Sequence, residues 1–186
     1  GAVESLVVTD TARAGALWRI RADGAGLSSR SPAGLPAHAG WEDAAVPPGK
    51  LGAYLRDFDA LLVRHELQGL PYGHFGDGCV HCRIDFPLAQ VPDGPARYRA
   101  FIEEAADLAA SYGGSMSGEH GDGRARSELL GRMYSPEALD LFAQVKAIFD
   151  PDNLLNPGVL VAPAPIDADL RAPAMRRSPL LRTHRQ

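Results

Sequence analysis

The sequence contains no run of eighteen apolar residues, and it therefore predicts no membrane-spanning helix. Residues 1–10 lack a basic segment followed by an apolar core, so we expect no signal peptide there. The net charge of −4 gives no reason to expect nucleic acid as a partner. What remains is a chain of 186 residues, 45% hydrophobic and 23% charged, which is typical of a globular domain with its own core.

Cysteine is also scarce, because Cys79 and Cys82 are the two cysteines of the chain. On a strand, residues three apart point to opposite faces, which opposes a shared metal ion or a disulfide. We expect one thiol in the core and the other near a cleft, both reduced in a cytoplasmic protein. A redox pair or half of a zinc site is the alternative interpretation.

A glycine-rich phosphate loop between a strand and a helix, the mark of a dinucleotide site, is missing as well. Two other stretches, residues 71–86 and 117–123, combine several glycines with histidine. Each contains Gly-Asp-Gly, which is common turn material and would say little by itself. The candidate metal-binding and catalytic residues lie around these turns.

The first stretch reads PYGHFGDGCVHCRIDF and predicts a turn followed by a strand. Past the turn, apolar and polar residues alternate, so one face of the strand is expected in the core and the other at a polar surface or cleft. The residues expected in the core are Val80, Cys82, Ile84 and Phe86. If the arm before the turn is extended, His74 and His81 lie on one face of the sheet.

Two neutral imidazoles that lie close together suit a divalent metal ion, although a third ligand is needed. The second stretch, SGEHGDG, offers Glu119 as that ligand. His120 follows directly, and in an extended loop the side chains of adjacent residues diverge. We therefore expect Glu119 to face the metal and His120 to face a substrate, where an imidazole can act as a general base.

Helices are predicted between these motifs. Thr9 and Asp10 can cap a first helix, Pro48 opens a second, and apolar spacing predicts a third over residues 97–112. Ser135 is the expected cap of a fourth helix. Its expected buried row consists of Leu139, Phe142, Val145 and Phe149.

Helices between strand pairs predict an α+β fold, with an antiparallel sheet covered by helices on one face. The composition changes at residue 163, since residues 163–186 are rich in proline and carry five arginines against two aspartates. We expect one domain over residues 1–162, followed by a tail or linker over residues 163–186.

Three motifs in order carry a resemblance to a known family. They are HFGDGCVH at residues 74–81, GEHGDGRAR at residues 118–126, and FDPDNLLNPG at residues 149–158. The chain resembles the C-terminal, substrate-binding domain of the FAD-linked oxidases that include D-lactate, glycolate and D-2-hydroxyglutarate dehydrogenases. Cys79 stands where that family commonly has asparagine. The resemblance implies a ferredoxin-like cap domain.

The resemblance also implies oxidation of a 2-hydroxy acid to the 2-oxo acid, with hydride passing to FAD. A divalent ion (zinc, manganese or iron) held by His74, His81 and Glu119 would bind the substrate, and His120 would take the hydroxyl proton. Arg19 or Arg126 would neutralise negative charge on the substrate or the flavin.

The same resemblance places most of the FAD site in another domain of the complete protein, with Asn156 approaching the flavin. We therefore expect the chain to be part of an enzyme, with the FAD-binding domain as its partner and an iron–sulfur module or other electron acceptor beyond it. The residues leave two other classes of function open. One is a metal-dependent hydrolase, and the other is a non-catalytic interaction domain.

Overall fold

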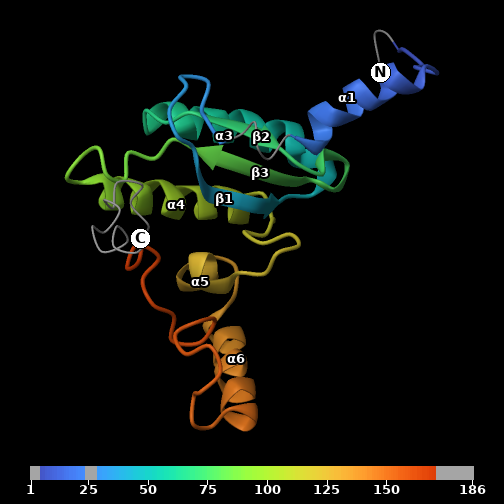
Figure 1. Cartoon of the computed structure of the whole chain (residues 1–186). Helices are drawn as coiled ribbons and strands as arrows, with labels where there is room; N and C mark the ends of the chain where they lie inside the picture. The colour runs from blue at the N-terminus through green and yellow to red at the C-terminus, as the bar shows by residue number, and fades with distance from the viewer. Residues whose placement is uncertain (1–4, 24–28, 171–186) are drawn as a thin grey trace, which may run out of the picture.

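The computed structural model describes residues 5–23 and 29–170, and its elements follow one another as shown in Figure 1. Two 3-10 segments, Pro48–Lys50 and Phe75–Asp77, precede α3 and β3, and a third, η3, spans Ser127–Arg132. The helices and strands are α1 (Thr11–Ala22), β1 (His38–Ala45), α3 (Leu51–Arg64), β2 (Gly69–Tyr72), β3 (Cys79–Ile84), α4 (Gly94–Ser111), α5 (Gly123–Arg126) and α6 (Pro136–Phe149).

The sheet has the strand order β1-β3-β2, and both pairings are antiparallel. Helix α3 connects β1 to β2, and α4 follows β3. After α4, Ser115 forms a single antiparallel bridge with Ala45, on the outer side of β1. This order corresponds to the split βαβ arrangement of ferredoxin-like folds, with the bridge in the place of a fourth strand. The predicted α+β class and antiparallel sheet are confirmed.

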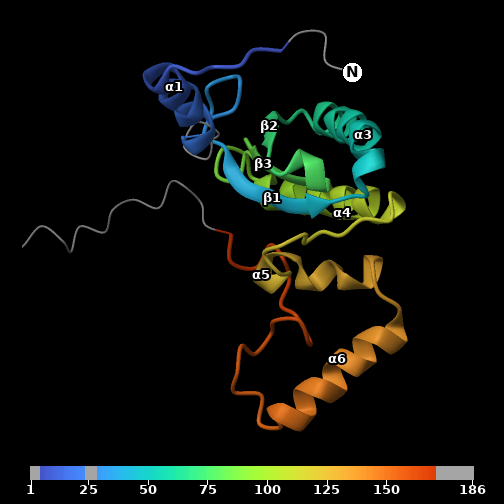
Figure 2. The same cartoon turned by 90° about the vertical axis from the view of Figure 1, so that its right-hand side faces the viewer.

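Helices α3 and α4 cover one face of the sheet, while α1 lies on the other side (Figure 2). The alternation predicted for β3 is correct, because its apolar residues are buried and Arg83 is not. A hydrogen bond from the Trp41 indole to the Tyr54 hydroxyl, 3.0 Å long, ties β1 to α3 inside the core. The side chains that β3, α3 and α4 contribute to this core include Val80, Cys82, Ile84, Phe58, Leu61, Phe101, Ile102 and Ala105.

The turn between β2 and β3 depends on Gly78. Its φ is +76°, in the left-handed region that favours glycine. A Cβ atom added there would lie 1.9 Å from the carbonyl oxygen of Val46. Because Val46 also donates its N–H to the Gly78 carbonyl at 3.0 Å, this turn is held against the end of β1. The close backbone approach therefore fixes the turn that lies between His74 and His81.

Helix α6 begins as predicted, because the Ser135 hydroxyl accepts a hydrogen bond from the Ala138 N–H at 3.3 Å. The prediction of a buried row along it is wrong, since none of its residues is buried. Phe149 is 81% exposed and Val145 is 55% exposed. The physical reason is that α6 projects away from the sheet below α5, as both views show, so the described part of the chain covers little of its surface.

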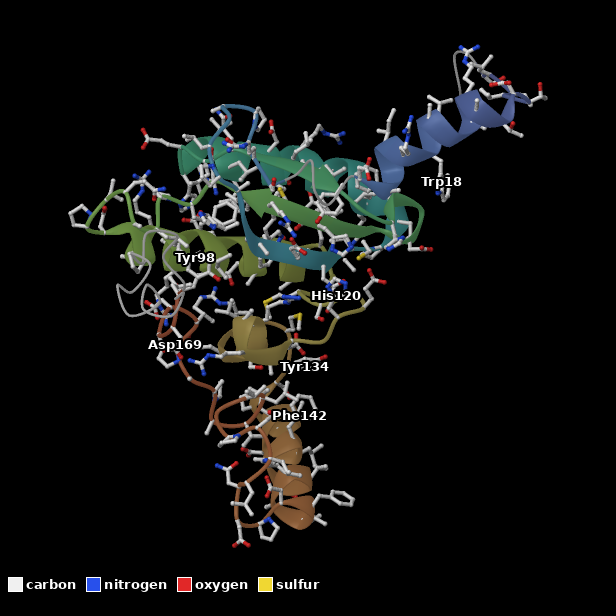
Figure 3. All side chains as sticks on the ribbon, in the orientation of Figure 1. Trp18, Tyr98, His120, Tyr134, Phe142 and Asp169 are labelled. Atoms are coloured by element: carbon white, nitrogen blue, oxygen red, sulfur yellow. The ribbon has the colours of Figure 1, made fainter. Side chains whose placement is uncertain are left out.

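The predicted tail falls partly outside the described residues, because residues 171–186 are not among them. Within residues 163–170, Ile166 is buried against the core and Asp167 pairs with Arg99 at 3.1 Å. Asp169 pairs with Arg124 of α5 (Figure 3). The boundary at residue 162 stays a prediction. Among the described residues, no helix is both long and apolar enough to cross a bilayer.

Candidate metal and substrate site

Two of the predicted site residues come from the β2–β3 hairpin. His74 follows β2 and precedes the 3-10 turn, where it is half exposed, and His81 is buried in β3. Their ring centroids lie 6.1 Å apart. The hairpin therefore brings the two imidazoles to the same face of the sheet, on the side opposite α3 and α4.

The third predicted ligand joins them from the loop after α4. Oε1 of Glu119 lies 3.4 Å from Nε2 of His74 and 3.4 Å from Nε2 of His81. It also lies 3.6 Å from Nε2 of His120. Three imidazole nitrogens thus converge on one carboxylate oxygen, although the motifs that carry them are about forty residues apart in the sequence.

This convergence fits a divalent metal ion. Donor atoms about 2.0–2.1 Å from a tetrahedral zinc ion lie roughly 3.3–3.4 Å from one another. The donor atoms of His74, His81 and Glu119 all lie within 4.8 Å of one another, and imidazole with carboxylate is a donor set that zinc, manganese and iron accept. The nitrogen that His81 turns toward Glu119 is Nε2, while its other ring nitrogen, Nδ1, is buried without a hydrogen-bond partner and could be satisfied by a water molecule.

His120, which is labelled in Figure 3, lies beside this group, close to both His81 and Glu119. Its ring stacks on that of His81, with centroids 5.1 Å apart and an interplanar angle of 13°. The expectation that the side chains of Glu119 and His120 diverge is wrong. The loop is curled rather than extended, because the backbone N–H groups of both residues donate to one buried carboxylate, that of Asp43.

Asp43 is the main residue of the site that sequence reasoning missed. It is fully buried in β1 and has a φ of +79°. Burial alone would raise the pKa of this carboxyl, but hydrogen bonds from the His120 and Glu119 backbones, with smaller contributions from Cys79 and Ser117, hold it below its ordinary value. The sequence carries no clear signal for this role, since Asp43 lies in a short polar stretch between alanines and a tryptophan.

The two cysteines are free and buried, and they occupy the positions expected of them. Cys82 is in the core, while Sγ of Cys79 lies 3.4 Å from Oδ1 of Asp43. Burial, with the adjacent Asp43 carboxylate, raises the pKa of the Cys79 thiol to about 12. The thiol is therefore a neutral donor to Asp43.

The histidine cluster opens into a cleft of about 580 Å³ between α1, the β2–β3 hairpin and the Glu119 loop. Its lining is of mixed polarity and, within the described part of the chain, contains no lysine or arginine. The residues that line it are Ile20, Ala22, Pro71, Tyr72, Gly73, His74, Phe75, His81, Glu119 and His120.

The other predicted residues lie outside this lining. Arg19 is exposed on α1 and does not line the cleft. Arg126 is largely buried, with Nη2 4.0 Å from the Asp43 carboxylate. Asn156 is exposed in the loop after α6. The structure therefore unites the predicted metal ligands and the base, but not the two arginines or the asparagine, whose roles stay predictions.

The structure thus defines a ferredoxin-like α+β domain with a histidine–carboxylate cluster in an open cleft. The comparison with known proteins is more specific. The sequence profile described as "FAD linked oxidases, C-terminal domain" matches residues 1–160, and the chain belongs to this family.

Curated relatives carry names from the same family. The chain is 41% identical to a D-lactate dehydrogenase of Archaeoglobus fulgidus over 64% of its own length and 26% of the relative. It is 37% identical to a D-2-hydroxyglutarate dehydrogenase of Haemophilus influenzae, over 66% of the chain and 12% of the relative. The glycolate oxidase subunit GlcD of Bacillus subtilis is 31% identical over 65% of the chain and 26% of the relative. The chain thus spans between 12% and 26% of the length of these proteins.

Proposed function

We propose that this chain is the substrate- and metal-binding part of an FAD-dependent dehydrogenase that oxidises a 2-hydroxy acid to the 2-oxo acid. The observation that carries the proposal is the convergence of three imidazole Nε2 atoms on Oε1 of Glu119, inside a cleft of about 580 Å³. Family membership supports redox chemistry rather than hydrolysis, because the relatives are named as dehydrogenases and an oxidase subunit.

The roles of the side chains follow from their positions. His74, His81 and Glu119 would hold the ion, since their donor atoms form one group. A divalent ion bound there would act as a Lewis acid toward the hydroxyl and carboxylate oxygens of the substrate. His120 is half exposed in the cleft, and its imidazole would take the proton of the substrate hydroxyl. The FAD of the complete enzyme would accept the hydride from C2.

The lining of the cleft also favours one kind of substrate. A dicarboxylate such as D-2-hydroxyglutarate needs a cation for its second carboxylate, and the described lining contains no lysine or arginine. Ile20, Ala22 and Phe75 instead offer apolar surface. We therefore infer a monocarboxylate of the D-lactate or glycolate type.

The flavin would be held mainly by another part of the complete protein. The apolar side chains exposed along α6 and the loop after it support this partner, because a surface of this kind is normally covered. They include Leu141, Phe142, Val145, Ile148, Phe149, Leu154 and Leu155. Asn156 lies in the same segment, which is consistent with a flavin nearby.

The first test is metal content. Protein purified without chelator should contain about one zinc, manganese or iron ion per chain by elemental analysis. His74→Ala, His81→Ala and Glu119→Ala should each lose it, because a structural or catalytic ion needs at least three protein ligands. His65→Ala is the matched control, since His65 also lies beside a carboxylate, that of Glu104 at 3.1 Å, but at the end of α3.

The second test is redox activity of the complete enzyme. D-lactate or glycolate should reduce the bound FAD, and kcat/KM for them should exceed that for D-2-hydroxyglutarate.

A wild-type protein that takes up none of the three metals would contradict the metal site. Metal binding without FAD reduction by any 2-hydroxy acid would contradict the redox function and leave a hydrolase as the better explanation.

A further inference from the structure

The carboxylate of Asp43 lies behind the loop that carries Glu119 and His120, outside the cleft lining. Its Oδ2 accepts the backbone N–H of His120 at 2.7 Å, and both of its oxygens lie 3.0 Å from the backbone N of Glu119. We propose that Asp43 is a positioning residue, whose carboxylate curls this loop so that the side chains of Glu119 and His120 meet. The inference rests on the proposed function, because it concerns the geometry of the same cluster.

A β-bulge places Asp43 where it can do this. In the register of β1 with β3, Trp41 pairs with Cys82 and Ala44 with Val80, so two residues of β1, Glu42 and Asp43, oppose His81 alone. Such a bulge redirects a side chain that regular alternation would send to the other face. Trp41 and Ala44 both remain in the core, and Asp43 turns toward the loop.

The backbone of the bulge is strained in a way that aspartate tolerates. A φ of +79° is uncommon for a residue with a side chain, and it persists only where the surrounding structure holds it. The surroundings do hold it here, because Gly118 donates its N–H to the Asp43 carbonyl at 2.7 Å. Both the backbone and the side chain of Asp43 are therefore bound to the same loop.

Asp43 acts through the loop and not as a metal ligand. A carboxylate has about four lone-pair positions. Besides the two backbone N–H groups, the Ser117 hydroxyl donates to Oδ2 at 3.1 Å and the Cys79 thiol to Oδ1 at 3.4 Å. With these donors in place and no exposed surface, the carboxylate has no free position for an ion.

The substitution Asp43→Asn isolates the role, because asparagine has nearly the same size and tolerates the same φ. It replaces one acceptor oxygen by an NH₂ group that faces N–H donors. With cobalt(II) as the probe, we expect affinity to fall about 10–100-fold and the visible absorption of the bound ion to change. Amide hydrogen exchange at Glu119 and His120 should accelerate at least about tenfold, with the amides of β3 unaffected.

Asp150→Asn is the matched control. Asp150 is also buried and also accepts from two successive backbone N–H groups, those of Leu154 and Leu155, at 2.9 and 2.8 Å. It lies at the end of α6, so its loss should leave cobalt affinity and absorption unchanged. Asp43→Gly is the second variant, because glycine adopts the positive φ without strain and the bulge can form without the carboxylate.

Wild-type cobalt affinity and absorption in both Asp43 variants would overturn the inference. So would an effect of equal size in Asp150→Asn, which would show a general loss of stability. If the wild-type chain binds no cobalt, the proposed metal site fails by itself. Amide exchange then decides about Asp43: faster exchange at Glu119 and His120 supports the positioning role, and unchanged exchange overturns it.

Discussion

His120 lies on the side of the cluster away from His74. The donor atoms of His120, Asp43 and His81 lie within 4.8 Å of one another. The donor atoms of His74, His81 and Glu119 form a second set that meets the same limit. Half of the His120 side chain is exposed to the cleft. At this position an imidazole can reach a substrate hydroxyl while three other side chains hold an ion, which is the division of roles that a metal-assisted proton abstraction requires.

Replacing His120 with alanine tests this division in the complete enzyme. We expect kcat to fall about 10²–10⁴-fold, the usual contribution of a general base, with the metal content retained. Glu119→Ala should lose both activity and metal. Elemental analysis beside steady-state kinetics measures the two quantities. Loss of the ion in His120→Ala would identify His120 as a fourth ligand, and an unchanged kcat would show that it is not the base.

At the scale of elements, the turn between β2 and β3 determines where the two hairpin histidines lie. Gly78→Ala should lower the free energy of unfolding by at least about 2 kcal/mol, because alanine at this positive φ is strained and its Cβ meets a backbone oxygen. Gly76→Ala is the matched control in the same turn, since a Cβ there meets nothing within 4 Å. It should change stability by less than about 0.5 kcal/mol.

Chemical denaturation of the three proteins measures these differences. Equal stability of the Gly78 and Gly76 variants would show that the turn can shift away from Val46. It would also show that the positions of His74 and His81 do not depend on this close approach.

At the scale of the whole molecule, α6 is an apolar helix without a buried residue. We infer that it packs on the FAD-binding part of the complete enzyme. Phe149→Glu should then weaken that contact by about 2–3 kcal/mol, the value of burying a phenylalanine side chain, and FAD should dissociate more readily. Val63→Glu is the control, since Val63 is 69% exposed on α3. FAD retention on desalting and the melting temperature are the measurements.

If Phe149→Glu and Val63→Glu retain FAD equally, α6 does not face the flavin-binding part. If only Phe149→Glu loses FAD, the covering of α6 and the holding of the cofactor are linked. The outcome concerns the whole protein. The described part of the chain forms the cleft, but it contains no phosphate-binding loop of the kind that holds a dinucleotide such as FAD.

The amino-acid sequence by itself determined much of this protein. Period-two alternation around His81 identified β3 and its buried face, and apolar spacing with Pro48 and Ser135 identified helices, because these are local properties of the chain. The two glycine–histidine motifs pointed to His74, His81 and Glu119 as one metal site, since their residue types suit an ion wherever the fold brings them together.

Only the tertiary structure decided how these residues meet. The curled loop that turns Glu119 and His120 toward each other depends on Asp43, which a β-bulge delivers from a strand some seventy-five residues earlier. Whether the apolar row of α6 is buried was likewise decided by what lies next to it. Local patterns state which face of an element is apolar, but a bulge, a buried carboxylate and an uncovered helix face depend on contacts between distant segments, which periodicity does not encode.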